Sequence, residues 1–225
     1  MIRDKVKTAT YFDEWIHYDQ DVIQQIRDEL ESGSLSPYGK VQAAYDLAKK
    51  ILGRGIMRYS RGDRLADVRD DLESLLAVRE QLKVLCDALP SSEQKNRFQY
   101  EQLSFDNYLD FFWWLSLAAC LGMGEVHLGR VIALIGNVGH DALLDRIAVK
   151  LGDRQRAVSS DLVFPKQYAL LLQALDAPSP EQPGLIRKFL DGWYKGNRNV
   201  AAWYDSHKGE DTGYVGYWSL EAALV

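Results

Sequence analysis

The sequence predicts an all-α fold, a compact multi-helix bundle in which two helical halves share an interface. First, apolar residues recur at three- and four-residue spacing along most of the chain, which is the period of one helix face. Second, no segment of useful length alternates apolar and polar residues as a half-buried strand does. Third, glycine, serine and proline interrupt the periodic segments, as at residues 32–37 and 178–183. A chain of 225 residues can bury a substantial core without disulfides or metals.

The first half, residues 1–100, is expected to form an N-terminal helical domain. Its apolar periodicity predicts three helices, at residues 12–30, 41–59 and 65–89. Gly53 and Gly55 weaken the second helix, because glycine costs up to about 1 kcal/mol in a helix interior. Pro90 ends the third helix, whose leucines form one continuous stripe. Residues 91–100 are polar and are expected to link the two halves.

The second half, residues 101–225, is expected to form a C-terminal helical domain. Residues 106–121 are apolar nearly all round, which is typical of a helix in the middle of a fold. Four aromatic residues of this helix are therefore expected in the core: Phe111, Phe112, Trp113 and Trp114. Further helices are predicted at residues 125–135, 140–151, 164–175, 185–194 and 217–224, with a turn or short helix at 199–204.

The net charge of −5 argues mildly against nucleic-acid binding, which favours a basic face. It is compatible with a basic partner, although mildly acidic globular proteins are common. Cys86 and Cys120 are far apart in apolar helical patterns, so buried free thiols in a reducing compartment are expected. Residues 1–10 lack the apolar run of a signal peptide. The most apolar stretch, residues 108–123, is too short to cross a bilayer, so we expect a cytoplasmic protein without a membrane partner.

No residue pattern in the chain predicts catalysis. Glu93-Gln94-Lys95 matches part of a restriction-type nuclease motif, but it lies in the polar link instead of on a β-hairpin. The histidines lack the three- or four-residue spacing of a helical zinc site, so no metal is expected: His17, His127, His140 and His207. No GxSxG elbow is present, and the glycine-rich residues 136–139 lack the lysine of a phosphate loop. Helix capping and surface charge are the roles expected for Asp141 and Asp145. No catalytic residue and no cofactor is predicted.

Residues 203–225 are unusually aromatic for the end of a chain, and we expect them to dock on the fold, because large rings remove much apolar surface from water. In the structural interpretation, His207 and Glu221 anchor this tail through hydrogen bonds, and its rings fill the core. The expected structural signature is Trp203, His207, Tyr214, Tyr217, Trp218 and Glu221. Glu210 and Asp211 lie on a glycine-flanked loop. The sequence favours two interpretations of them equally: they bind a basic partner, or they are simply solvated.

The start of the third helix is the other candidate partner surface. By the helical period, Asp67, Asp70 and Asp71 fall on one side, opposite the leucine stripe. A solvated face is the default interpretation, and an acidic patch that meets a basic partner is the alternative. The predicted partner-binding residues are Asp67, Asp70, Asp71, Glu73, Glu210 and Asp211.

Four segments of the chain resemble one known family. The tail at 203–225 is similar to the closing signature of the C-terminal domain of PoNi-type immunity proteins. Residues 106–123 and 141–148 also resemble that domain, and residues 3–26 resemble the start of the family's N-terminal domain. The resemblance implies a non-enzymatic inhibitor whose partner is a PoNe-type nuclease toxin, with a DNase favoured. The resemblance implies no active-site residue in this chain.

Two other function classes stay open on the sequence. One is a helical enzyme with an unrecognised carboxylate or metal site. The other is a scaffolding protein without a toxin partner. For an immunity protein, both occlusion of the toxin's substrate groove and stabilisation of an inactive toxin are compatible with the sequence, and self-association is undetermined.

Overall fold

The computed structural model describes residues 1–209 and 213–225, and these residues contain helices and no strand, so the all-α prediction is confirmed. The chain divides into two compact units. The first unit consists of residues 1–100 and 205–217, and the second consists of residues 101–204 and 218–225. The tail therefore contributes to both units. The domain boundary near residue 100 remains a prediction.

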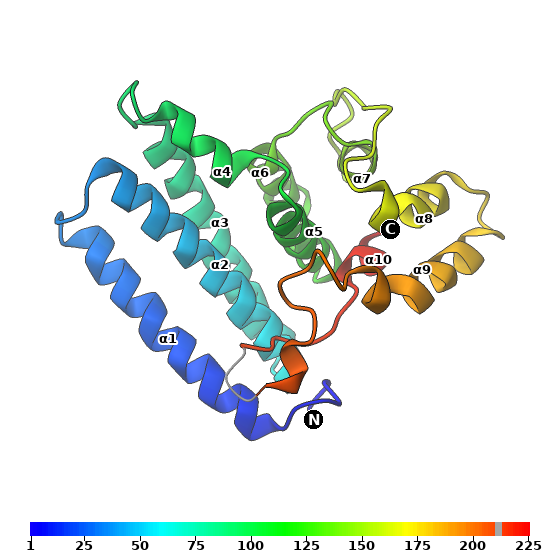
Figure 1. Ribbon diagram of the computed structural model, residues 1–225, viewed down its shortest axis with the longest axis horizontal. Helices are drawn as coiled ribbons and strands as arrows, with labels where there is room; N and C mark the ends of the chain where they lie inside the picture. The colour runs from blue at the N-terminus through cyan, green and yellow to red at the C-terminus, as the bar shows by residue number, and fades with distance from the viewer. Residues whose placement is uncertain (210–212) are drawn as a thin grey trace. The chain divides into compact units, whose positions relative to one another are not determined.

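The first unit is built on three long helices, α1 (Ala9–Glu31), α2 (Pro37–Arg61) and α3 (Leu65–Asp87), followed by short turns at η1 (Gln94–Arg97) and α4 (Phe98–Glu101). In Figure 1, α2 lies beside α1, and α3 also packs against α2. The tail adds the short 3-10 helix η2 (Ser206–Lys208) to this unit. The periodicity predicted the three long helices but missed the helical turns at 94–101.

Local signals explain where these helices begin and end. The side chains of Thr8 and Ser36 accept hydrogen bonds from backbone N–H groups in the first turns of α1 and α2. The helix α2 ends at Gly62, which has a left-handed backbone (φ 99°). A Cβ at this glycine would lie 2.1 Å from the carbonyl oxygen of Met1. Only glycine therefore fits where the chain start crosses the end of α2.

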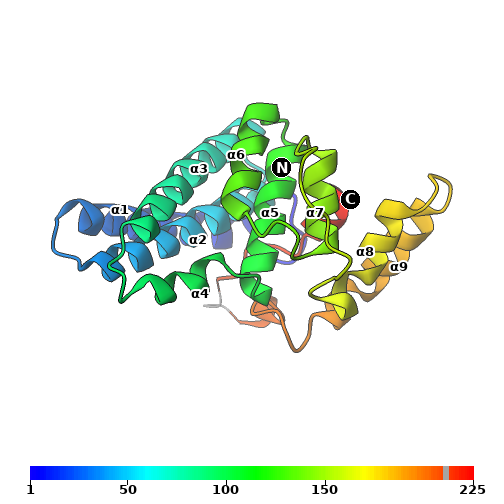
Figure 2. The ribbon, with the colours of Figure 1, turned by 90° about the horizontal axis from the view of Figure 1, so that it is seen from above.

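The second unit contains α5 (Phe105–Cys120), α6 (Glu125–Ile135), α7 (Ala142–Lys150), α8 (Pro165–Asp176), α9 (Gln182–Gly196) and α10 (Leu220–Leu224). Helices α8 and α9 lie side by side in both ribbon views (Figures 1 and 2). Helix α10 packs against α5, and the Ser116 hydroxyl donates a 2.6 Å hydrogen bond to the carbonyl oxygen of Leu220. This unit is centred on the apolar helix α5, as the sequence predicted.

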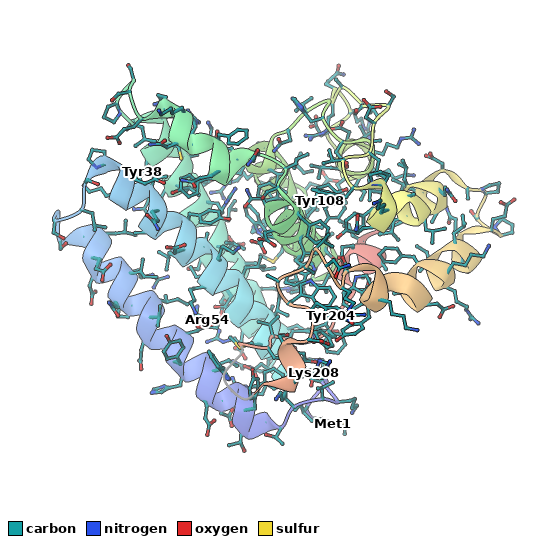
Figure 3. All side chains as sticks on the ribbon, in the orientation of Figure 1. Met1, Tyr38, Arg54, Tyr108, Tyr204 and Lys208 are labelled. Carbon is teal, nitrogen blue, oxygen red and sulfur yellow. The ribbon has the colours of Figure 1, made fainter. Side chains whose placement is uncertain are left out.

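Aromatic rings form much of the core of the second unit. Tyr108 of α5 is fully buried, and its ring centroid lies 4.7 Å from Phe112, 5.0 Å from Phe164 and 5.1 Å from Tyr168. Three of the four aromatics predicted for the core are buried, whereas Trp113 is half-buried. Tyr108 is labelled in Figure 3 on α5. Such clusters combine large apolar burial with favourable ring geometry, and they hold the helices of this unit together.

The two cysteines have different environments. Cys86 is a buried free thiol in the first unit, as predicted. Cys120 is a free thiol that is exposed, so the expectation of burial was wrong for it. The reason is its place at the last position of α5, where the helix leaves the core before Gly122 turns the chain. Among the described residues, no helix combines the length and hydropathy that a membrane span requires.

Candidate functional site

The acidic residues predicted at the start of α3 do not form one exposed face. Asp70 and Glu73 are exposed, and Asp67 is partly exposed and paired with Arg64 at 2.7 Å. The hydrogen bond from Arg64 lowers the pKa of Asp67. Asp71 is buried, with 3% exposure, which corrects the prediction that it lies on a solvated face. Its position falls between Val68, Leu72 and Leu75 on the side of α3 that packs against α2.

Asp71 instead belongs to a buried ion cluster between α2 and α3. It accepts a 2.6 Å hydrogen bond from Arg54, and Arg58 lies 3.2 Å from its other oxygen. Burial raises the pKa of Asp71, and the attraction of the two arginines opposes that rise. Arg54 is labelled in Figure 3 on α2. Removing one member would leave a buried charge without its counter-ion, so this cluster has a structural role.

The tail docks inside the first unit through its described residues 205–209 and 213–217. Tyr214 is buried with Phe12, Ile16 and Met57, and its hydroxyl donates a 2.7 Å hydrogen bond to Asp4. Tyr217 is half-buried, and its hydroxyl lies 2.7 Å from Nδ1 of His207. Burial is the main cause that raises the pKa of Tyr214 well above its usual range. Tyr214 therefore holds this segment to the rest of the unit, whereas the contact between His207 and Tyr217 lies within the tail.

The remaining signature residues lie in the second unit. Trp203 is half-buried and stacks on Trp193, with ring centroids 4.7 Å apart. Glu221 is fully buried and accepts hydrogen bonds from the Tyr168 hydroxyl at 3.3 Å and the Trp193 indole N–H at 3.5 Å. Burial raises the pKa of Glu221 to about 7. Trp218 is half-buried, so the expectation that it lies fully in the core was wrong.

Two predicted partner-binding residues, Glu210 and Asp211, lie outside the described residues. The flanking Gly209 is described, and its carbonyl oxygen accepts a 2.9 Å hydrogen bond from the Lys7 ammonium. This contact ties the edge of the loop to the start of the chain.

A groove lies between α1, α2 and the tail, and the sequence did not predict it. Its cavity measures about 470 Å³. Its apolar part is formed by Val22 and Ile26 of α1, Met57 of α2 and Val215 of the tail. The complete lining is Trp15, Asp19, Val22, Ile26, Asp46, Lys49, Lys50, Gly53, Met57, Gly213 and Val215. Every lining residue belongs to the first unit.

The groove also contains charged side chains from both helices. Asp19 of α1 is 4% exposed and binds the Lys50 ammonium at 2.7 Å through Oδ1. Asp46 of α2 has a raised pKa because burial outweighs the attraction of Lys49. The sequence signal for this site was an acid on the apolar side of a helix: Asp19 follows Trp15 and Ile16 at the spacing of one helix face. An apolar groove with few placed charges is typical of a binding site.

The sequence motifs that were rejected for catalysis have structural roles. Gln94 of the Glu-Gln-Lys triplet donates a 2.8 Å hydrogen bond to the carbonyl oxygen of Leu89 near the end of α3. Asp141 caps α7 by accepting a 2.8 Å hydrogen bond from the backbone N–H of Leu144, as predicted. Asp145 is buried and binds Arg156 at 2.6 Å, so the expectation of a surface charge was wrong for it. Across residues 1–209 and 213–225, no group of three or more histidine, cysteine or acidic side chains has the arrangement of a metal site.

Comparison with known families covers nearly the whole chain. Residues 3–133 match the family described as PoNe immunity protein (PoNi), N-terminal. Residues 139–225 match the family described as PoNe immunity proteins (PoNi), C-terminal. Searches of curated proteins and of solved structures found no match. The two family matches cover the helices of the first unit, the aromatic core of the second and the docked tail. The chain therefore belongs to the family of PoNe immunity proteins.

Proposed function

We propose that this protein is an immunity protein that binds a cognate PoNe-type nuclease toxin, a DNase, and neutralises it by tight association. The observation that carries the proposal is the match to both the N-terminal and C-terminal PoNi families. The protein acts as a binding partner and not as an enzyme. Its cognate nuclease reaches DNA inside the cell, so we expect the protein to act in the cytoplasm.

The proposed mechanism requires a specific and nearly permanent interface. Stable interfaces of this kind bury on the order of 1,600 Å² in total. Because one active nuclease can damage a chromosome, we expect a dissociation constant in the nanomolar range or below. Buried aromatic and arginine anchors supply most of such affinity. The net charge of −5 suits a basic nuclease and speeds the encounter, so the association rate is expected to fall with added salt.

The test is co-expression of the protein with the nuclease encoded beside its gene, followed by co-purification and a DNA-degradation assay. In a titration, DNA cleavage should fall linearly and end at a fixed stoichiometric ratio of inhibitor to toxin. Inhibition far below that ratio would favour an enzyme that modifies the toxin. Absence of a complex together with unimpeded cleavage, or binding weaker than micromolar, would contradict the proposal.

A further inference from the structure

We propose that the groove between α1 and α2 is a docking point for the toxin, and that it receives a basic side chain, a lysine or arginine, from the toxin's surface. In this arrangement Asp19 and Asp46 are the counter-ions, and Trp15 is the aromatic wall. This inference rests on the proposed function, because it names the place where the partner binds.

The shape of the groove suits a long side chain with an apolar stem and a charged end. The cavity of about 470 Å³ has apolar walls from Val22, Ile26 and Met57, and carboxylates on both helices. Lysine and arginine bury their methylene stems against apolar surface while the charged group finds polar partners. A purely apolar occupant would leave the carboxylates without a cation, and their desolvation would cost free energy.

The carboxylates of the groove have capacity for another cation. Asp19 is buried and already paired with Lys50 through Oδ1, so Asp46 is the carboxylate that an incoming cation would meet. Asp46 forms no hydrogen bond with a described residue, and only the charge of Lys49 favours its ionised form. A cation that enters the groove would give Asp46 a close counter-ion.

The two lysines at the groove do not reverse this preference. The Lys50 ammonium is already paired with Asp19, and it also lies 5.4 Å from the ring centroid of Tyr18. The Lys49 ammonium lies 5.6 Å from the ring centroid of Tyr45 on its own helix. Both positive charges therefore have partners, whereas the charge of Asp46 is only weakly compensated.

The exposed side of α1 is acidic. Helix α1 contains one arginine and no lysine, and its Arg27 donates a hydrogen bond to Ser74. The exposed acidic residues of α1 are Asp13, Glu14, Asp21, Asp28, Glu29 and Glu31. Of these, Asp13 is paired with Arg61 at 2.7 Å. Such an acidic surface attracts a basic partner at long range, and the groove must then supply the specific contacts.

Trp15 supplies the aromatic component that a basic side chain favours. Its ring makes an edge contact with Tyr18, with centroids 5.6 Å apart, and it lines the cavity. A guanidinium or ammonium group on the face of tryptophan gains roughly 0.5–2 kcal/mol, more when it is desolvated. Tyr18 is 54% exposed and extends this aromatic surface beyond the groove.

Helix α3 offers a weaker surface for a basic partner. Its acidic residues alternate with Arg69, Arg79 and Lys83, and Asp67 is already paired with Arg64. Asp71 is buried and compensated by two arginines. The groove combines the weakly compensated Asp46 with an apolar cavity and the Trp15 ring, although the sequence alone singled out α3.

The test compares one charge reversal in each region, Asp46→Lys and Asp70→Lys. Both positions are exposed aspartates within long helices, and both variants change the net charge equally. Binding to the cognate nuclease is measured by calorimetry or surface plasmon resonance at about 0.15 M salt, where surface charges are screened beyond roughly 8 Å. We expect Asp46→Lys to raise the Kd at least tenfold and Asp70→Lys to change it less than twofold.

Thermal unfolding of each variant shows whether the fold is retained. If Asp46→Lys lowers the melting temperature, the nearly isosteric Asp46→Asn replaces it, with an expected increase in Kd of three- to tenfold. If the wild-type protein neutralises the nuclease while the folded Asp46 variants bind normally, the groove proposal is overturned and the immunity function stands. Equal weakening by Asp46→Lys and Asp70→Lys would also overturn it, because only net charge would then matter. Failure of the wild-type protein to bind would instead overturn the proposed function.

Discussion

The two docking segments of the tail use the same chemical pair with the roles exchanged. In the first unit, the tail supplies a phenol, Tyr214, and the chain start supplies the carboxylate of Asp4. In the second unit, the tail supplies the carboxylate of Glu221, and the helix α8 supplies the phenol of Tyr168. Each phenol donates its hydrogen bond to the carboxylate in a buried setting.

The two carboxylates differ in how well they are stabilised. Asp4 accepts three short hydrogen bonds, from the Tyr214 hydroxyl at 2.7 Å and from the backbone N–H groups of Val6 and Lys7 at 2.8 Å. Glu221 accepts longer bonds on Oε1, and its Oε2 has no hydrogen-bond partner among the described residues. Burial alone therefore does not define an anchor: the donors around it decide whether its charge is tolerated.

The largest expected effect is on the aromatic anchor. Tyr214→Ala removes a ring that is 1% exposed and leaves a cavity beside Phe12 and Met57. We expect the free energy of unfolding to fall by about 3–5 kcal/mol, as for other large buried aromatics. Urea denaturation followed by circular dichroism measures this change. As a control, Tyr18→Ala at an exposed position should cost about 1 kcal/mol or less, and an equal loss in both variants would contradict the anchoring role.

The second expected effect is a pH dependence caused by Glu221. Burial raises its pKa to about 7 in the folded state, so between the unfolded value near 4.3 and 7 the folded protein binds the proton more tightly. The free energy of unfolding should therefore fall as the pH rises through this interval, by up to about 3 kcal/mol. Glu221→Gln should remove this part of the slope, whereas exposed Glu14→Gln should retain it. Parallel pH profiles for wild type and Glu221→Gln would show that Glu221 titrates normally.

Trp218 sharpens the comparison because it lies three residues before the second anchor, Glu221. Since it is half-buried, Trp218→Ala should lower the free energy of unfolding by about 1–3 kcal/mol, less than a fully buried tryptophan. Thermal and urea unfolding measure the loss. A cost above about 4 kcal/mol would mean that this ring carries more of the tail's docking than Glu221 does.

The smallest expected effect isolates the phenol in the second unit. Tyr168→Phe removes the hydrogen bond to Glu221 Oε1 and leaves the ring stack with Phe112 intact. We expect a loss of about 0.5–1.5 kcal/mol below pH 7, where Glu221 is protonated, and a larger loss above it, where the hydrogen bond is to a charged group. Unfolding measured at pH 6 and pH 8 tests this. Identical losses at both pH values would contradict a charged Glu221 as the acceptor.

Helix positions followed closely from the sequence, because apolar periodicity and capping residues act locally. The sequence was a poorer guide to which side of each helix is buried. The sequence predicted that Asp71 is exposed. Its counter-ions, Arg54 and Arg58, lie on another helix, so the residue spacing within α3 could not reveal them. The groove was missed for the same reason: Asp19 and Asp46 come together only when α1 and α2 pack. The tail rings were expected to dock, but their division between two units depends on distant partners such as Asp4.

The distance along the chain between Asp4 and Tyr214 has a consequence for synthesis. These two residues are separated by 210 positions, so the ribosome must add 210 residues after Asp4 before the first unit can be completed. Helices α1 to α3 can form early, but the space beside Phe12 and Ile16 stays unfilled until the tail emerges. Contacts so distant in sequence form late, because closing a long loop costs entropy before any contact compensates for it. During this interval the nascent chain exposes an apolar surface next to its acidic first helix, and molecular chaperones recognise surfaces of this kind.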